Sequence, residues 1–149
     1  MERSGCPVIK LSNIVLAIDN SKHSEAAVRE AFGLAQTCSA KIFAVSIVES
    51  NPEFEALAPQ MVEKMGAAAK KLLDSVTEQA KKENIKCEAI AHTGEDPAQF
   101  IVEEAKKRKA DMIIMGKHGE RSSLTKFFMG SVTARVLSHA PCNVLVIVE

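Results

Sequence analysis

The 149-residue sequence contains neither tryptophan nor tyrosine, and phenylalanine occurs only six times. Proteins that bind unpaired nucleic acid usually stack the bases on aromatic side chains, and this chain has little material for such a surface. It also lacks an excess of either charge, because 19 Lys and Arg balance 19 Asp and Glu. Without a net positive field, neither nucleic acid nor an anionic membrane is an expected partner.

Long apolar runs are absent as well. A membrane-spanning helix needs roughly 20 consecutive apolar residues, and no run approaches that length. The first run, 14–18, is too short for a signal peptide and ends at Asp19. We therefore expect no membrane partner and a cytoplasmic location.

Cysteine is scarce and dispersed. The sequence has four cysteines, none of them in a C-x-x-C pair: Cys6, Cys38, Cys87 and Cys142. Without that spacing a zinc site or a redox couple is not indicated, and we interpret all four as buried or idle thiols.

The length suits one domain, since a chain of this size buries roughly two-thirds of its unfolded surface and has no room for a second core. We therefore expect a single domain over 1–149 that opens with a short N-terminal arm, 1–12. Short apolar runs alternate with longer stretches of helical periodicity, the pattern of βαβ units on a parallel sheet. Five strands follow from it, at 13–18, 42–48, 86–91, 112–115 and 144–148.

Four helices are expected between these strands. The first takes Ser24 as its N-cap, and the third begins at Asp96 and Pro97, a capping residue followed by proline, and ends around Lys109. The last begins near Ser131 and ends at Pro141. The second runs from about 60 to 83, after a loop containing two prolines, with an apolar face formed by Met61, Met65, Ala68, Leu72 and Val76.

The strands read as continuous apolar runs, so helices should cover both faces of the sheet in a doubly wound α/β/α architecture. Ligands bind such sheets beyond the carboxyl ends of the strands, where the strand order reverses. The first strand ends in Asp19-Asn20-Ser21 and the fourth in Gly116-Lys117-His118-Gly119. We therefore expect these two strands to flank the binding site.

Two glycine-containing turns follow the fourth strand. Gly116-x-x-Gly119 comes directly after the strand, and Gly130-Ser131-Val132-Thr133 opens the next helix. Glycine lets backbone amides approach an anion, and a helix start adds unpaired donors and a positive dipole end, so the pair predicts a phosphate site. We expect the hydroxyls of Ser131 and Thr133 to add donors, and nearby cations to offset phosphate charge: Lys117, His118, Arg121 and Lys126. Alternatively, these glycines serve only a tight turn and close packing.

These motifs resemble the universal stress protein family, whose nucleotide-binding members carry G-x-x-G, a spacer, and Gly followed by Ser or Thr. The similarity extends from Asn13 to the C-terminus and includes Val-Leu-Ala-Ile-Asp-Asn-Ser, Met-Gly-x-His-Gly and the final Pro-Cys-Asn-Val-Leu-Val-Ile-Val. The spacer here, Glu120 to Met129, is one residue longer than the family's usual pattern.

The resemblance implies a Rossmann-like sheet of order 3-2-1-4-5 that binds ATP, ADP or AMP. Asp19 would face the ribose hydroxyls or act through a bound Mg²⁺, and Val45 would offer its backbone to the adenine edge. It further implies a homodimer formed through the last strand, Val144 to Val148. The expected binding residues are Asp19, Asn20, Val45, Met115, Gly116, His118, Gly119, Gly130, Ser131, Val132 and Thr133.

No catalytic residue can be assigned. A P-loop needs Gly-Lys followed by Ser or Thr, whereas Gly116-Lys117 precedes His118. We therefore expect a nucleotide-binding regulator of the stress response with slow or no ATP hydrolysis. The longer spacer supports an alternative, a dimeric adaptor that binds no nucleotide. A phosphoacceptor receiver domain shares the fold class but needs Asp at the third strand's end, where this chain has His92-Thr93-Gly94.

Overall fold

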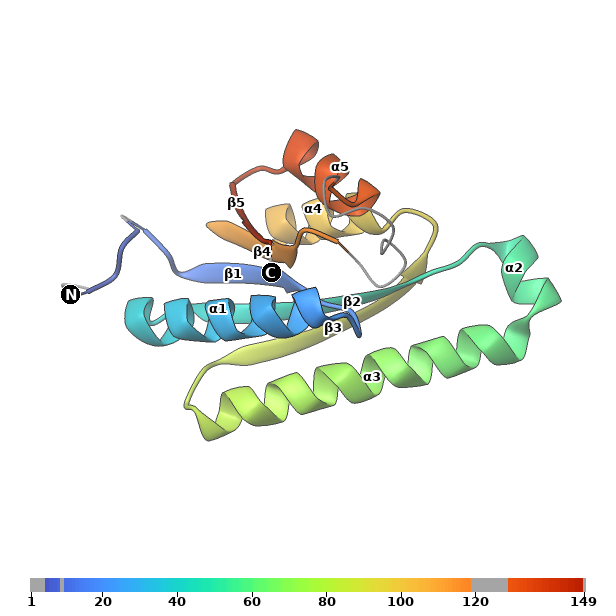
Figure 1. Cartoon of the computed structure of the whole chain (residues 1–149), viewed down its shortest axis with the longest axis horizontal. Helices are drawn as coiled ribbons and strands as arrows, with labels where there is room; N and C mark the ends of the chain where they lie inside the picture. Colours follow the sequence, from blue (N-terminus) through green and yellow to red (C-terminus); the bar gives the residue numbers. More distant parts are fainter. Residues whose placement is uncertain (1–4, 9, 119–128, 149) are drawn as a thin grey trace.

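The computed structural model describes residues 5–8, 10–118 and 129–148. Its centre is a five-stranded parallel sheet of order β3-β2-β1-β4-β5, as expected (Figure 1). Observed strand ends differ from the predicted ones by at most three residues, the largest difference being at the end of β3. The strands are β1 (Asn13–Ala17), β2 (Lys41–Glu49), β3 (Cys87–Gly94), β4 (Met112–Gly116) and β5 (Asn143–Ile147).

Helices cover both faces of this sheet. They are α1 (Lys22–Cys38), α3 (Pro59–Lys82), α4 (Pro97–Lys107) and α5 (Ser131–His139), whereas the short helix α2 (Pro52–Leu57) has no buried residue and contacts α3. In Figure 1, α1 and α3 lie on one side of the strands, and α4 and α5 lie on the other. None of the helices in the described ranges is long and apolar enough to cross a membrane.

Two apolar clusters hold these layers together. Alternate strand residues such as Leu16, Ile42 and Ile114 pack with α1 and α3. Their sequence neighbours, including Val15 and Ile113, face the opposite way and pack with α4 and α5. Because side chains alternate along a strand, each continuous apolar run serves both clusters at once.

The helix α2 was not expected, because its segment contains proline and was predicted as a loop. Asn51 acts as its N-cap, with the side-chain oxygen accepting a hydrogen bond from the Phe54 amide at 2.7 Å. Pro52 occupies the first turn, where its missing N–H is no loss. The same residues that suggested a loop therefore start a short helix.

The start of α1 also differs from the prediction. Its N-cap is Ser21 rather than Ser24, and the Ser21 side chain accepts from the Ser24 amide. Ser24 instead lies buried in the first turn, where its hydroxyl donates to Asp19. Both serines are residue types that suit an N-cap. The hydroxyl of Ser24 is engaged by Asp19, which leaves Ser21 to cap the helix.

The buried face of α3 is rotated relative to the predicted one. Val76 is buried as expected, but the other buried residues are Ala69, Leu73 and Ala80, whereas Met61 is 55% exposed. A helix of 24 residues is about 36 Å long and outreaches the strands it covers. Its first half extends beyond the sheet (Figure 1), so apolar residues there are not packed as the periodicity suggests.

A bidentate ion pair joins α4 to α5. Asp96 is the N-cap of α4, as predicted, accepting from the Gln99 amide at 3.1 Å. Both of its carboxylate oxygens also accept from Arg135, at 2.8 and 2.7 Å. The guanidinium and the amide hydrogen bond hold the pKa of Asp96 below its usual value, which keeps the cap charged in mild acid.

The interpretation of all four cysteines as thiols is wrong for one pair. Cys6 and Cys38 form a disulfide, with their Cα atoms 4.8 Å apart. They lie 32 residues apart in sequence, so only the folding of the arm onto α1 brings them together. Cys87 and Cys142 are free, and burial raises the pKa of Cys87 to about 11 and raises that of Cys142.

Leu16 lies fully buried in the central strand β1. Leu16→Ala should lower the free energy of unfolding by about 2–5 kcal/mol, because it leaves a cavity between the sheet and the helices. Urea denaturation of both proteins measures the difference. Leu57→Ala is the control, since Leu57 is 78% exposed and its truncation should change stability by less than about 0.5 kcal/mol.

Candidate functional site

A cavity of about 260 Å³ opens at the carboxyl ends of β1, β2 and β4. This is the position where the strand order reverses, between β1 and β4. The residues that line it are Ala17, Ile18, Asp19, Ser24, Val45, Ile47, Glu49, Met65, Pro97, Ile101, Met115, Gly116, His118, Gly130, Ser131, Val132 and Thr133.

Most of the residues expected at the site lie around this one cavity. Asn20 does not: it is exposed and is not among the lining residues. Gly119 lies outside the described residues, as do Arg121 and Lys126. The expected residues that share the cavity are Asp19, Val45, Met115, Gly116, His118, Gly130, Ser131, Val132 and Thr133.

The end of β4 and the start of α5 are joined by two hydrogen bonds. The Gly130 amide donates to the Lys117 carbonyl at 2.9 Å. The hydroxyl of Thr133, a buried residue, donates to the Gly116 carbonyl, also at 2.9 Å. The two segments therefore meet at the cavity, but the Thr133 hydroxyl proton is committed to this bond, contrary to its expected use for phosphate.

The first turn of α5 offers the unpaired donors of the site. Its N-cap, Gly130, has no side chain to accept from the helix, and the first intrahelical bond runs from the Ala134 amide to the Gly130 carbonyl. No described residue accepts from the amides of Ser131, Val132 and Thr133, which all line the cavity. Such a helix start attracts an anion through its N–H groups and its dipole.

Asp19 is held in a tight polar turn at the end of β1. Its Oδ1 accepts from the Ser21 amide at 2.8 Å and from the Ser24 hydroxyl at 2.9 Å. Its own amide donates to the Ser24 oxygen at 2.7 Å. These bonds orient the carboxylate at the cavity, and they also show that Asp19 serves the start of α1.

Gly116 allows α1 to approach the end of β4. A Cβ atom added at Gly116 would lie 2.6 Å from the Cβ of His23, a separation that real structures do not tolerate. The packing explanation for this glycine therefore holds in this structure, whatever else the residue does. Gly130 has φ −61°, so its backbone conformation does not by itself require glycine.

His118 lies at the same end of the cavity. Its ring meets that of His23 edge to face, with centroids 5.5 Å apart. Burial, His23 and Lys117 together lower the pKa of His118, which favours the neutral imidazole at pH 7. A bound phosphate would act in the opposite direction, because a nearby negative charge favours the protonated ring.

The other end of the cavity has an open backbone edge. The carbonyl of Val45, the residue expected to contact the base, accepts from the Ile18 amide at 2.9 Å and is occupied. Two residues on, Ile47 directs its amide and carbonyl to the same side, beyond the end of β1. Neither group bonds to a described residue. The backbone groups open to a ligand on this strand are therefore those of Ile47, whereas the sequence analysis named Val45.

Several lining residues were not expected. Ile101 and Pro97 come from α4, and Met65 comes from the overhanging part of α3. Glu49 reaches the cavity from the end of β2. These residues come from elements far apart in the chain. Of the four, only Glu49 could have been expected from the sequence, because it lies at the carboxyl end of a strand, where ligands bind in such sheets.

The described residues do not by themselves form a metal site. No cluster of three or more His, Cys, Asp or Glu within them is placed to hold a metal ion. Magnesium is commonly bound by one or two carboxylates together with substrate phosphates. Asp19 fits only that arrangement, as one carboxylate beside a phosphate-bearing ligand.

The fold and cavity define a doubly wound α/β protein with a cavity at its switch point that is lined by the start of a helix. The chain matches the universal stress protein family over residues 10–148 and belongs to that family. A universal stress protein of Staphylococcus aureus (strain USA300) is 31% identical over 143 residues, which cover 94% of this chain and 86% of that protein.

Solved structures agree on the fold. Universal stress protein UspA from Lactobacillus plantarum has a TM-score of 0.78 and 27% identity, with 93% of this chain and 98% of that chain covered. The universal stress protein from Archaeoglobus fulgidus in complex with dAMP has a TM-score of 0.65, 23% identity, and coverages of 94% and 99%. A universal stress protein in complex with cAMP has a TM-score of 0.66, 22% identity, and coverages of 92% and 96%.

The close contact at Gly116 can be tested by a double-mutant cycle. Gly116→Ala should lower the free energy of unfolding by about 1–3 kcal/mol, because the new methyl group overlaps the His23 Cβ. In a His23→Gly background the same change should cost clearly less, although His23→Gly itself weakens α1 by about 1 kcal/mol. Urea denaturation of the four proteins gives the coupling; equal costs in both backgrounds would contradict the contact.

Proposed function

We propose that this protein binds an adenine nucleotide in the described cavity and acts as a regulator of the stress response. The observation that carries the proposal is the start of α5, whose first three residues line the cavity and whose amides have no acceptor among the described residues. Related structures of the family contain dAMP or cAMP, which supports an adenine nucleotide as the ligand.

The polar groups of the cavity suggest one orientation for the nucleotide. Phosphates would lie at Ser131, Val132 and Thr133, where the helix dipole and the amides favour negative charge. Asp19 would repel them, and therefore suits the ribose hydroxyls or an Mg²⁺ ion carried by the phosphates. The amide and carbonyl of Ile47 match the acceptor and donor that adenine presents along its Watson–Crick edge.

Hydrolysis of ATP would be slow or absent. The described cavity contains one carboxylate at the phosphate end, Asp19, and its Oδ1 already accepts two hydrogen bonds. Burial, His23 and Lys117 lower the pKa of His118, which makes its ring a weaker base for activating water. We therefore propose a regulator that acts by binding the nucleotide and not by hydrolysing it. We also propose that it is located in the cytoplasm.

Ser131→Asp tests the proposed phosphate site. The new carboxylate would lie at the amides of α5, where it stabilises the helix but repels phosphate, so ATP affinity should fall at least about tenfold with folding unchanged. Isothermal titration with ATP, ADP and AMP measures the loss. Ser75→Asp, which adds the same charge at an exposed position of α3 away from the cavity lining, should leave affinity unchanged.

Two results would overturn the proposal. The first is the absence of binding of any of the three nucleotides to the unaltered protein, which would favour the dimeric adaptor. The second is equal affinity of the unaltered protein and Ser131→Asp, which would place the ligand elsewhere. Mass spectrometry of denatured purified protein would also reveal a co-purified nucleotide and identify it.

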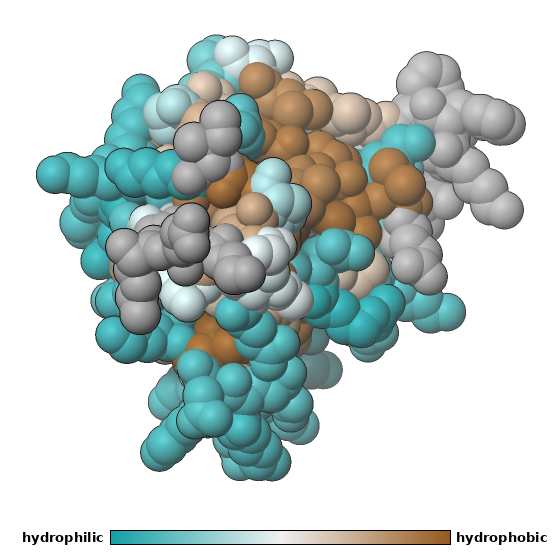
Figure 2. Space-filling view, turned by 90° about the vertical axis from the view of Figure 1, so that its left-hand side faces the viewer, coloured by the Kyte–Doolittle hydropathy of each residue, from teal (hydrophilic) through white to brown (hydrophobic). Residues whose placement is uncertain are grey.

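We further propose that the protein forms a homodimer through β5. This strand is at the edge of the sheet and its apolar residues are only partly buried, and Val148, which follows it, is 73% exposed. Figure 2 shows a broad hydrophobic area on the upper part of the molecule, the part that carries α5 and β5 in Figure 1. Proteins usually protect an exposed apolar edge strand by packing other structure against it, and a second copy of this chain would do so here.

Val146→Pro tests this interface. The Lys117 amide donates to the Ile147 carbonyl, so Ile147 faces β4 and Val146 directs its own N–H to the outer edge. Proline there removes an edge donor without breaking a bond to β4 and should convert a dimer to a monomer. Light scattering at micromolar concentration measures the mass. Val146→Ala is the control, because it keeps the N–H donor and should stay dimeric. A monomeric unaltered protein would refute the interface.

A further inference from the structure

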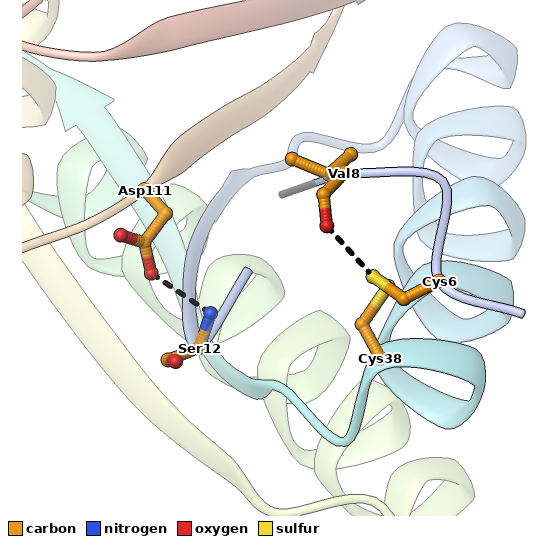
Figure 3. The surroundings of a disulfide bond; sticks show 5 residues. All are labelled: Cys6, Val8, Ser12, Cys38 and Asp111. Atoms are coloured by element: carbon orange, nitrogen blue, oxygen red, sulfur yellow. Dashed lines mark hydrogen bonds between the residues drawn. A yellow bond between two sulfur atoms is a disulfide. The ribbon is translucent and has the colours of Figure 1, made fainter. Parts of the chain in front are cut away.

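The Cys6–Cys38 disulfide fastens the N-terminal arm to the end of α1 (Figure 3). Cys38 is the last residue of α1 and is fully buried, whereas Cys6 is only partly buried. Cys6 and Val8 both pack against the apolar cluster beneath α1 and α3. The bond therefore closes the arm over the amino-terminal end of the core.

The arm also accommodates the reduced form of Cys6. Its sulfur lies 3.4 Å from the Val8 carbonyl oxygen. A sulfur in a disulfide carries no proton, so this contact becomes a hydrogen bond only when Cys6 is a thiol. The same local geometry thus provides a partner for the sulfur after the disulfide is opened.

The other two cysteines are poor competitors for oxidation. Burial raises the pKa of Cys87 to about 11 and raises that of Cys142 as well, so little thiolate forms at neutral pH. Unlike Cys38, which lies beside the accessible Cys6, neither of them forms a disulfide in the structure, and both should remain reduced under conditions that oxidise an accessible thiol. A reversible reaction would therefore be confined to Cys6 and Cys38.

We propose that Cys6 and Cys38 form a reversible thiol–disulfide site that exchanges with small disulfides such as oxidised glutathione. The Cys6 thiolate attacks one glutathione sulfur, forming a mixed disulfide and releasing one glutathione thiolate. The Cys38 thiolate then attacks the Cys6 sulfur, closing the protein disulfide and releasing the second glutathione. Two protein thiols are oxidised, one oxidised glutathione is reduced to two thiols, and the released thiolates take up the protein's protons.

This assignment of roles follows from exposure. Cys6 is reachable from solvent and is the attacking and departing sulfur, while the buried Cys38 can react only with a partner already placed beside it. The reverse reaction with reduced glutathione returns both thiols and releases the arm.

A second anchor limits how much of the chain is released. Asp111, just before β4, accepts hydrogen bonds from the amides of Ser12 and Asn13 at 2.8 and 3.0 Å, the first of them drawn in Figure 3. These bonds are independent of the disulfide and hold the start of β1. Reduction should therefore free the arm up to about Lys10, which is exposed, and leave the sheet in place.

The nucleotide cavity is at the opposite end of the sheet from this bond. The disulfide joins the residues preceding β1 to the last residue of α1, whereas the cavity opens where β1 ends and α1 begins. Nucleotide affinity should thus be the same in the oxidised and reduced proteins. The proposed redox site and the proposed nucleotide site can consequently be tested independently, and refuting one would leave the other unaffected.

The experiment compares the unaltered chain with Cys6→Ser, and with Cys142→Ser as a matched control that removes a free cysteine. Reduced protein is incubated with oxidised glutathione without oxygen, alkylated in denaturant, and analysed by peptide mass spectrometry. We expect the Cys6–Cys38 linkage in the unaltered protein and in Cys142→Ser, and its loss when reduced glutathione is added in excess.

Limited trypsin digestion then reports on the arm. Cleavage after Lys10 should be about tenfold faster in the reduced protein and in Cys6→Ser than in the oxidised protein, because local opening becomes easier. Two free thiols after treatment with oxidised glutathione would overturn the proposal, as would a stable glutathione adduct on Cys6. Equal cleavage rates in both redox states would overturn control of the arm.

Discussion

The site depends on the junction between the end of β4 and the start of α5. The Gly130 amide bonds to the Lys117 carbonyl, and the Thr133 hydroxyl bonds to the Gly116 carbonyl. Together these bonds hold the first turn of α5 against the sheet at the point where the strand order reverses. The residues of that turn, Ser131, Val132 and Thr133, consequently line the cavity, and their amides have no acceptor among the described residues.

The two sides of the cavity have opposite polarity. On the α1 side, Asp19 supplies negative charge and is held by the Ser21 amide and the Ser24 hydroxyl. On the α5 side, the helix start supplies amide donors that no described residue accepts from, and the positive end of a dipole. A ligand with an anionic group and neighbouring hydroxyls satisfies both sides, and a nucleotide has that chemistry. The backbone groups of Ile47, which bond to no described residue, would suit the base of the proposed nucleotide.

The two ends of the sheet therefore have different roles. The carboxyl ends carry the cavity, the unpaired amides and the open strand edge. The amino ends carry the arm, which Asp111 and a disulfide hold at two separate points. Because the core of β1, β2 and β4 lies between these ends, a change in the arm need not reach the cavity. This separation would let one small domain combine the proposed ligand site with the proposed redox-sensitive terminus.

The sequence alone determined the features that depend on short-range chemistry. The apolar runs marked the strands, Asp96 and Pro97 marked the start of α4, and Gly116 and Gly130 marked the end of β4 and the start of α5, which meet at the cavity. The sheet order came from the resemblance of these motifs to a family, not from the strand pattern. Periodicity and capping are local properties, which is why they can be recognised before the chain is folded.

Only the tertiary structure decided the contacts between distant segments. The cysteine pair, the choice of Ser21 over Ser24 as a cap, and the buried face of α3 all depend on what packs beside them. Tertiary structure also decided that the backbone groups without a described partner belong to Ile47 and not to Val45, because the edge of a strand is open only where the neighbouring strand has ended. Residue type shows what a group can bond to, but the folded chain determines which partner lies within reach.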